Sequence, residues 1–366
     1  MTEKSNKYKS ALKVQEGIEQ PSSVNADYLK QIKANKQALL TLDAFVDGIL
    51  SGNRTILSKA ITLIESSLSE HQKLAQQIIE KCLPLAGNSI RLGITGVPGV
   101  GKSTFIEALG KHITNSGHKL AVLAIDPSSE RSKGSILGDK TRMEELAVDP
   151  NAFIRPSPSA GSLGGVARKT REIIILCEAA GFDTIFVETV GVGQSETAVH
   201  SMVDFFLLLM LANAGDELQG IKRGIMEMAD AIAINKADGD NIQKANLAMA
   251  QYKNALHLFP PTESGWIPQV TTCSSYTREG IANVWNIITD YVTYTKGNGY
   301  FRGKRQEQSK NIMLETINDF LKDNFYSNKI VTTLIPKIQK EILEDKLSSY
   351  MAAQKLLDEY YKSIEK

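Results

Sequence analysis

A glycine-rich run near residue 100 constrains the fold of this chain more than any other feature. The run reads Gly96, Val97, Pro98, Gly99, Val100, Gly101, Lys102 and Ser103, which matches the pattern G-x-x-x-x-G-K-[ST] throughout. Residues 90–95 before it are largely apolar, as in a buried strand, and residues 104–116 after it carry apolar side chains at helical spacing. A strand, a glycine loop and a helix in this order predict backbone N–H groups and a helix N-terminus that together surround a phosphate chain.

The side chains of this loop predict a nucleoside triphosphate and magnesium as ligands. Lys102 is expected to reach the β- and γ-phosphates, and the Ser103 hydroxyl is expected to bind magnesium. Thr104, the next residue, completes the predicted nucleotide-binding set at this loop. A glycine-rich turn without a ligand is the alternative, and the flanking strand and helix argue against it.

Composition excludes several classes of partner. The chain has 366 residues, 42% of them hydrophobic, which is enough for one large domain with additions or for two domains. A formal net charge of +1 gives no electrostatic reason to expect nucleic acid or an anionic membrane. The longest apolar run, residues 205–212, is too short to span a bilayer. Three widely spaced cysteines suggest free thiols, and the polar N-terminus lacks the apolar core of a signal peptide, so we expect a cytoplasmic protein.

Apolar patterns divide the chain into four predicted parts. We expect a flexible tail over residues 1–25, a helical extension over 26–86, a mixed domain over 87–297 and a second helical extension over 298–366. Strand patterns in the mixed domain lie at 90–95, 119–126, 152–155, 183–188, 204–212, 230–236 and 268–273. Several of these strands are almost wholly apolar and most are separated by helical stretches, which indicates a doubly wound α/β fold around a mostly parallel sheet. Ligands of such a fold bind at the carboxyl ends of the strands.

The two helical extensions carry no recognisable chemistry. Asn53 is placed to cap a helix, residues 299–305 resemble a connector, and Pro336 is expected to bend or interrupt its helix. The apolar stripes of the C-terminal extension predict either that it packs back on the mixed domain or that it forms a homodimer.

A second motif, Asn235-Lys236-Ala237-Asp238, follows the predicted strand at 230–236 and matches the N-K-x-D element of guanine-nucleotide proteins. The Asp238 carboxylate would accept hydrogen bonds from N1–H and N2–H₂ of guanine, a donor pair that adenine lacks, so GTP is favoured over ATP. Asn235 would fix the loop and contact N7, and the stem of Lys236 can lie along the ring. Cys273, Ser274 and Ser275 end the next strand and could cover the base with backbone groups. A plain strand-to-helix turn remains the alternative for this motif.

A third motif, Glu188-Thr189-Val190-Gly191, follows the predicted strand at 183–188. Its position matches the D-x-x-G element, in which the acid holds magnesium through water and the glycine senses the γ-phosphate; here Glu188 replaces aspartate. Many small GTPases place a water-orienting glutamine directly after that glycine, whereas this chain has Val192, and Gln194 lies further on. We therefore expect slow hydrolysis by the protein alone and faster hydrolysis when a partner orders the loops.

Two further segments carry charged residues near the same sheet edge. Asp126 follows a predicted strand and is a magnesium candidate, with an Asp-Pro turn as the alternative. Residues 214–223 include Asp216 and Lys222 and form either a third switch or an exposed turn, while residues 133–142 form a switch or simply a loop.

These segments together resemble the MeaB/MMAA family, GTPases that chaperone methylmalonyl-CoA mutase and related cobalamin-dependent acyl-CoA mutases and that were formerly labelled ArgK or LAO transport kinases. The resemblance rests on the glycine loop at 96–103 and on the following segments: Asp126-Pro127-Ser128-Ser129, residues 134–142, Arg155-Pro156-Ser157-Pro158, residues 188–196 and residues 215–222. It covers residues 40–300 closely and the C-terminus more loosely.

The resemblance implies a P-loop G domain of the SIMIBI type, related to the nickel-enzyme and signal-recognition GTPases. It implies that Lys102, Ser103, Asp126 and Glu188 form the phosphate and magnesium site. It also implies that Asp216 and Lys222 act with Lys102 and Glu188 in catalysis, as a third switch that relays the nucleotide state to the mutase. The implied role is to gate cofactor loading and to protect the mutase, and the C-terminal helices are implied to form a homodimer.

Three other functions are compatible with part of the sequence. A protein kinase of a transport system is permitted by the phosphate loop, although Asp238 favours guanine. A nickel metallochaperone would require clustered cysteine or histidine residues, and the five histidines here are scattered. A nucleotide-gated binding module without hydrolysis is disfavoured by Lys102, Ser103 and Glu188.

Overall fold

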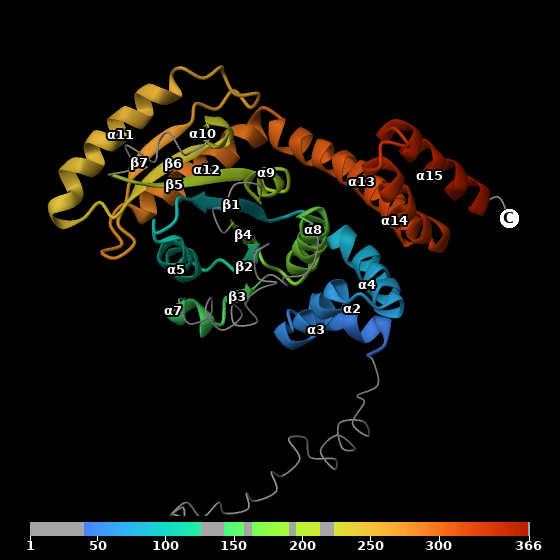
Figure 1. The fold of residues 1–366 in the computed structure, drawn as a ribbon. Helices are drawn as coiled ribbons and strands as arrows, with labels where there is room; N and C mark the ends of the chain where they lie inside the picture. The colour runs from blue at the N-terminus through green and yellow to red at the C-terminus, as the bar shows by residue number, and fades with distance from the viewer. Residues whose placement is uncertain (1–39, 126–142, 157–162, 190–194, 213–222, 365–366) are drawn as a thin grey trace, which may run out of the picture. The chain divides into compact units, whose positions relative to one another are not determined.

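The computed structural model describes residues 40–125, 143–156, 163–189, 195–212 and 223–364. The chain divides into two units, Met1–Thr41 and Leu42–Lys366, and the description that follows concerns the second unit by itself (Figure 1).

A seven-stranded sheet with the order β3-β2-β4-β1-β5-β6-β7 forms the centre of this unit, and every neighbouring pair is parallel. The strands are β1 (Ile90–Gly96), β2 (Leu120–Ile125), β3 (Ala152–Arg155), β4 (Thr184–Thr189), β5 (Phe205–Leu211), β6 (Ala231–Asn235) and β7 (Gln269–Thr272). Each predicted strand is present within one residue at either end, so the predicted doubly wound fold is confirmed. Central strands such as β5 are apolar throughout because helices cover both faces of the sheet.

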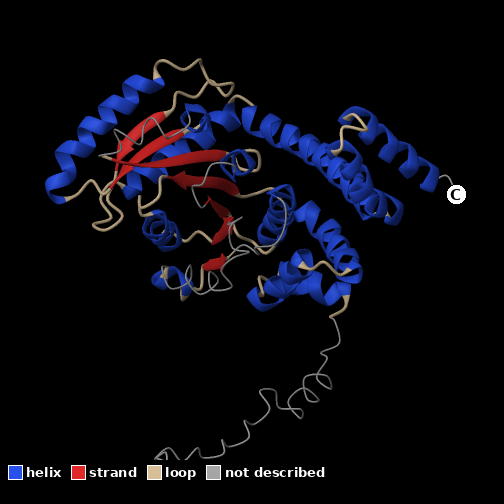
Figure 2. Ribbon diagram, in the orientation of Figure 1, coloured by secondary structure: helices blue, strands red, loops and turns tan. Residues whose placement is uncertain are grey.

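The direction of the crossovers decides which face each helix covers (Figure 2). The helices of this domain are α5 (Lys102–Asn115), α7 (Glu144–Ala147), α8 (Leu163–Ala179), α9 (Ser195–His200), α10 (Arg223–Met228), α11 (Ile242–Leu256) and α12 (Ile281–Gly297). The β1–β2 connection runs along the sheet in one direction, and the β3–β4, β4–β5 and β5–β6 connections run in the other. Right-handed crossovers therefore place α5 on one face and α8, α9 and α10 on the opposite face. Helix α12 packs against α5 and β5, and α11 packs against β6 and β7.

Three N-terminal helices pack against α8. They are α2 (Leu42–Leu50), α3 (Arg54–Glu65) and α4 (Ser69–Cys82), followed by the short 3₁₀ helix η1 (Leu83–Leu85). Asn53 caps α3 as predicted, because its side chain accepts hydrogen bonds from the backbone N–H groups of Thr55 and Ile56. All three cysteines are buried and free, which confirms the expected thiols. No helix in the described ranges is long and apolar enough to cross a membrane.

The C-terminal extension consists of α13 (Tyr300–Ser327), α14 (Lys329–Leu343) and α15 (Ser349–Ile364). The predicted connector at 299–305 is wrong: α13 begins at Tyr300, and Gly299, at φ 82°, turns the chain between α12 and α13. The charged residues of this stretch resembled a loop because their partners lie far away in the sequence. The predicted interruption at Pro336 does not occur, since α14 continues through it with Val331 and Ile338 buried on one side.

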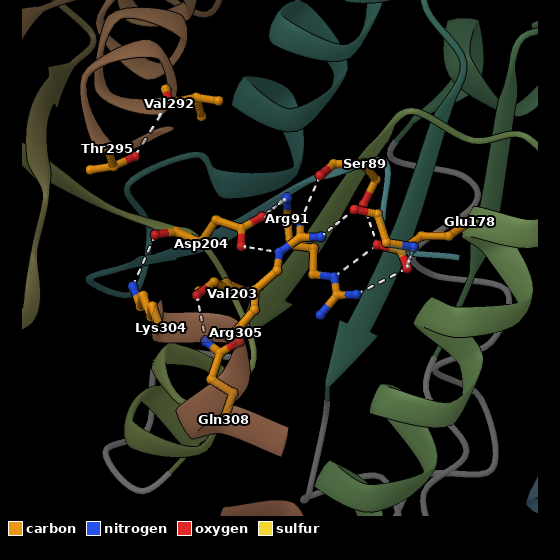
Figure 3. Close-up of polar contacts among 11 residues, drawn as sticks. Ser89, Arg91, Glu178, Val203, Asp204, Val292, Thr295, Lys304, Arg305 and Gln308 are labelled. Carbon is orange, nitrogen blue, oxygen red and sulfur yellow. Dashed lines mark hydrogen bonds and ion pairs between the residues drawn. The ribbon is translucent and has the colours of Figure 1, made fainter. Parts of the chain in front are cut away.

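Hydrogen bonds and ion pairs join helix α13 to the N-terminal ends of the central strands β1 and β5 (Figure 3). Arg305 donates to both carboxylate oxygens of Asp204, at 2.8 and 2.7 Å, and to the carbonyls of Gly87 and Ser89. Arg91 on β1 makes a matching two-bond contact with Glu178 on α8, at 2.9 Å for each bond. The Asp204 and Glu178 side chains are each 1% exposed, and each of these buried carboxylates is paired with one guanidinium. Such pairing offsets the cost of burying the charge.

Candidate nucleotide site

The glycine loop between β1 and α5 adopts the backbone conformation that its sequence predicts. Gly99 and Gly101 have φ values of 77° and 88°, a region that favours glycine. A side chain at Gly96 would lie 2.6 Å from the Leu209 carbonyl oxygen on β5, so this glycine permits close packing of the loop on the sheet. Lys102 is the first residue of α5, and its ammonium donates to the Gly96 carbonyl at 2.9 Å across the mouth of the loop.

The Asn235 side chain connects the glycine loop to the loop that follows β7. Its Nδ2 donates to the Val100 carbonyl at 2.8 Å, and its Oδ1 accepts from the backbone N–H and the hydroxyl of Ser275 at 3.1 and 2.8 Å. Asn235 is 1% exposed, so these bonds satisfy a buried amide. A side chain at Gly101 would lie 3.3 Å from Asn235 Nδ2, so the glycine leaves room for this contact.

Lys236 makes a second connection to the same loop. Its ammonium donates to the Gly99 carbonyl at 2.9 Å, and its own carbonyl accepts from Asn241 Nδ2 at 2.7 Å. Lys236 has a φ of 60°, which is uncommon for a lysine and marks a sharp turn at the end of β6. Its stem thus crosses from the N-K-x-D motif to the phosphate loop.

Asp238 is held by the loop after β7. The Ser274 hydroxyl donates to Asp238 Oδ2 at 2.5 Å, and the same hydroxyl accepts from the Thr277 backbone N–H at 3.1 Å. The Ala237 N–H donates to the Cys273 carbonyl at 3.0 Å, which fixes the two loops side by side. Cys273 and Ser274 are buried, so in this structure they support the motif, and Asp238 presents a carboxylate suited to the two donors of guanine.

The environment of Lys102 includes an acid that the sequence analysis did not single out. Burial lowers the pKa of Lys102, and the negative charges of Glu188 and Glu196 act in the opposite direction. Glu196 is 1% exposed at the start of α9, and Glu188 is half-buried near the end of β4. Glu196 lies in the run 188–196, and its place at the first turn of a helix after that run is the signal that could have identified it.

The residues predicted for magnesium are only partly described. Ser103 lies in the first turn of α5 and Glu188 lies on β4, where hydroxyl and carboxylate oxygens suit magnesium once phosphate oxygens and water complete the shell. Among the described residues no group of three or more histidine, cysteine or acidic side chains could hold a metal alone. Asp126, Gly191, Asp216 and Lys222 lie outside the described residues, so their assignments remain predictions.

Comparison with protein families gives one match that spans most of the chain. Residues 57–330 match the model described as methylmalonyl-CoA mutase-associated GTPase MeaB.

Curated relatives extend over a similar length. A probable GTPase of Mycobacterium bovis is 48% identical over 318 residues, covering 87% of this chain and 95% of the relative. The protein of Mus musculus named methylmalonic aciduria type A homolog, mitochondrial, is 45% identical over 326 residues, covering 86% of this chain and 79% of the relative. Among solved structures, that of a protein named LAO/AO transport system kinase has a TM-score of 0.71 and 37% identity, covering 88% of this chain and 99% of that chain.

Proposed function

The chain belongs to the MeaB family of methylmalonyl-CoA mutase-associated GTPases, and on that premise we propose that it is a GTP-hydrolysing chaperone of a cobalamin-dependent acyl-CoA mutase. The proposed partner is methylmalonyl-CoA mutase, which the family description names. The protein would gate cofactor loading and protect the mutase from inactivation. We also propose that it acts in the cytoplasm, where buried free thiols remain reduced.

The observation that carries the nucleotide part of this proposal is the Asn235 contact. One buried amide binds the phosphate loop at Val100 and the base-side loop at Ser275, at distances of 2.8 to 3.1 Å. A single side chain thus fixes the phosphate loop and the proposed base-binding loop relative to each other. Such preorganisation supports nucleotide binding because less ordering is required when the ligand arrives.

The chemistry assigned to each residue follows from its place. Lys102 would exchange the Gly96 carbonyl for phosphate oxygens and stabilise the charge that develops on the transferred group. Ser103, Glu188 and Asp126 would hold magnesium, which supplies further neutralisation of phosphate charge. Because Val192 occupies the position of the water-orienting glutamine, we propose slow hydrolysis alone and stimulation when the mutase orders the loops containing Gly191, Asp216 and Lys222.

The same proposal includes a homodimer through the C-terminal extension. Helices α13, α14 and α15 enclose an apolar groove of 710 Å³, and large apolar side chains at its rim are exposed. Leu321, Tyr361 and Ile364 are 60%, 55% and 57% exposed. Contiguous exposed apolar surface of this kind marks association surfaces in soluble proteins.

The decisive experiment measures GTP hydrolysis by the purified protein with and without methylmalonyl-CoA mutase, each with and without cobalamin. The proposal predicts that the mutase binds and raises the rate. It also predicts that Lys102→Ala reduces turnover about 100-fold or more while the exposed Lys253→Ala retains it. A mutase that neither binds nor stimulates would contradict the chaperone role and leave the GTPase assignment intact.

A kinase activity, which the name of the similar solved structure suggests, is tested separately. Incubation with γ-labelled GTP and candidate acceptor proteins should release labelled phosphate and leave the proteins unlabelled. Stoichiometric labelling of an acceptor would favour the kinase.

A further inference from the structure

The loop that follows β7 turns back on itself within residues 273–280. The Ser274 N–H donates to the Glu279 carbonyl at 2.9 Å, and this bond closes the turn. Gly280 has a φ of 74°, and a side chain at this position would lie 2.5 Å from the Thr272 carbonyl oxygen. The backbone of this turn is therefore tightly constrained.

The same turn holds the N-K-x-D motif by hydrogen bonds. Ser275 donates to the amide oxygen of the motif's asparagine through both its N–H and its hydroxyl, and Ser274 donates to the Asp238 carboxylate. The Thr277 N–H in turn donates to the Ser274 hydroxyl at 3.1 Å. Tyr276 lies between Ser275 and Thr277, so its backbone is fixed beside the motif from both sides.

The Tyr276 side chain extends from this turn into solvent. The three residues before it are buried, whereas Tyr276 is 89% exposed. Arg278, another long side chain of the turn, is directed to α7, where it pairs with Glu145 at 2.7 Å. Single exposed aromatic residues are common on protein surfaces, so exposure alone indicates nothing. What distinguishes Tyr276 is a rigid backbone next to the residue that would bind the base.

Lys236 and the turn contact the motif in different directions. The Lys236 ammonium binds the Gly99 carbonyl at 2.9 Å, so its stem runs from the motif toward the phosphate loop. The turn contacts the motif instead through the Asp238 carboxylate. The stem of Lys236 can lie along one face of a bound base, which leaves the other face to be covered.

We propose that the Tyr276 ring stacks on the guanine of the bound nucleotide, on the face opposite the Lys236 stem. This inference rests on the GTP site proposed above and adds a residue to it. An aromatic ring stacks on any base, because every base has a π-face. Tyr276 thus contributes affinity for the nucleotide, whereas Asp238 contributes the preference for guanine.

The test is calorimetric titration of the full-length protein with GDP in the presence of magnesium. Tyr276→Ala should weaken GDP binding by about fivefold or more, because base–aromatic stacking contributes on that order. Tyr276→Phe, which retains the ring, should bind GDP as the wild type does. Tyr350→Ala is the matched control, because it removes a tyrosine that is 78% exposed on α15, and it should also retain the wild-type affinity.

Steady-state GTP hydrolysis separates this role from a structural one. The ring would contact the base equally in the ground state and in the transition state, so Tyr276→Ala should raise KM and leave kcat unchanged. Inosine diphosphate lacks the N2 amino group, which stacking does not involve. The variant should therefore lose affinity for inosine diphosphate by the same factor as for GDP. Its melting temperature without nucleotide should equal that of the wild type, because the side chain is exposed.

The possible results distinguish the stacking from the nucleotide site itself. A wild-type protein that binds neither GDP nor GTP contradicts both. If the wild type binds GDP and Tyr276→Ala loses less than about fivefold in affinity, the stacking is overturned and the site stands. The stacking is also overturned if Tyr276→Phe is weakened as much as Tyr276→Ala, because the hydroxyl rather than the ring would then make the contact.

Discussion

At the scale of single residues, Asp238 decides which base the proposed site accepts. Ser274 donates to one carboxylate oxygen, and no other described side chain donates to this carboxylate. In the proposed site, the guanine N1–H and N2–H₂ groups would therefore meet an acceptor that is already oriented.

Asp238→Asn is predicted to lower GTP affinity about 100-fold or more, because an amide cannot accept from both donors. Xanthosine triphosphate, which carries a C2 carbonyl in place of the amino group, should bind the variant more tightly than GTP does. Competition binding with a fluorescent nucleotide measures both affinities. Asp240→Asn, two residues further on and exposed, is the control and should retain the wild-type preference.

Asp230 is a buried acid that makes stability depend on pH. Burial, with a smaller contribution from Asp204, raises its pKa to about 6, although Lys304, the Phe206 N–H and Tyr291 act in the opposite direction. In the unfolded chain an aspartate titrates near its ordinary value of about 3.9. Between these two values the folded state retains a proton that the unfolded state has lost. The free energy of unfolding contributed by this group is therefore fully present below the lower value and is lost as pH rises through the higher one.

Asp230→Asn is predicted to remove this dependence. In the wild type, Asp230 should lower the free energy of unfolding by up to about 1.4 kcal/mol per pH unit between about pH 4 and pH 6. Urea denaturation across that range measures the slope, and the free energy of unfolding of the variant should fall less, or rise more, with increasing pH than that of the wild type. Asp290→Asn, an exposed acid on α12, is the control, and an equal slope in Asp230→Asn and wild type would contradict the assignment.

At the scale of elements, α13 is joined to the sheet by charge and by packing. Arg305 binds Asp204 through two hydrogen bonds, and its guanidinium carbon lies 4.5 Å from the centre of the Phe301 ring. Lys304 adds a bond to the Asp204 backbone carbonyl at 2.9 Å. These contacts orient the first turns of the C-terminal extension.

Arg305→Met is predicted to destabilise the protein by about 3–5 kcal/mol, because it leaves the Asp204 carboxylate buried without its guanidinium. Methionine retains much of the packing of the arginine stem, so the loss reports the charge pair. Chemical denaturation of full-length protein measures it. Arg302→Met lies on the same helix but is exposed, and its free energy of unfolding should stay within about 0.5 kcal/mol of wild type.

At the scale of the whole molecule, the apolar groove of α13–α15 is the surface proposed for dimerisation. These helices contact one another, and α13 also packs against α8 and α12. The extension therefore does pack back on the domain through the first part of α13, and exposed apolar side chains remain further along it.

Leu321→Asp is predicted to convert the proposed dimer to monomer, because association would bury an unpaired charge. Sedimentation velocity measures the oligomeric state. Asn324→Asp introduces the same charge at an exposed position one turn away and should leave the dimer intact. A wild-type protein that is monomeric at micromolar concentration would contradict the dimer itself.

Local sequence pattern was sufficient to predict the strands of the sheet and the phosphate loop. Strands β2, β4, β5 and β6 are each marked by a short, largely apolar run. The segment from Gly96 to Ser103 carries the turn, the helix start and the lysine of the phosphate loop. The carboxyl-end rule for parallel sheets then predicted that Lys102, Asn235 and Asp238 would serve one site. Their side-chain contacts were beyond prediction, because Asn235 and Val100 are brought together only by the order of β1, β5 and β6.

The sequence by itself determined the strand–loop–helix unit and the apolar strands, since both depend on residues close together in the chain. Tertiary structure alone decided that Arg305 belongs to a helix anchored on Asp204, that Glu196 lies near Lys102, and that Arg171 and Gln308 line one cavity. Each of these relations joins residues that are far apart in the chain, by 101 positions for Arg305 and Asp204. A contact between residues so far apart in the sequence depends on how the whole chain packs. No local pattern in the intervening residues specifies which two side chains will meet.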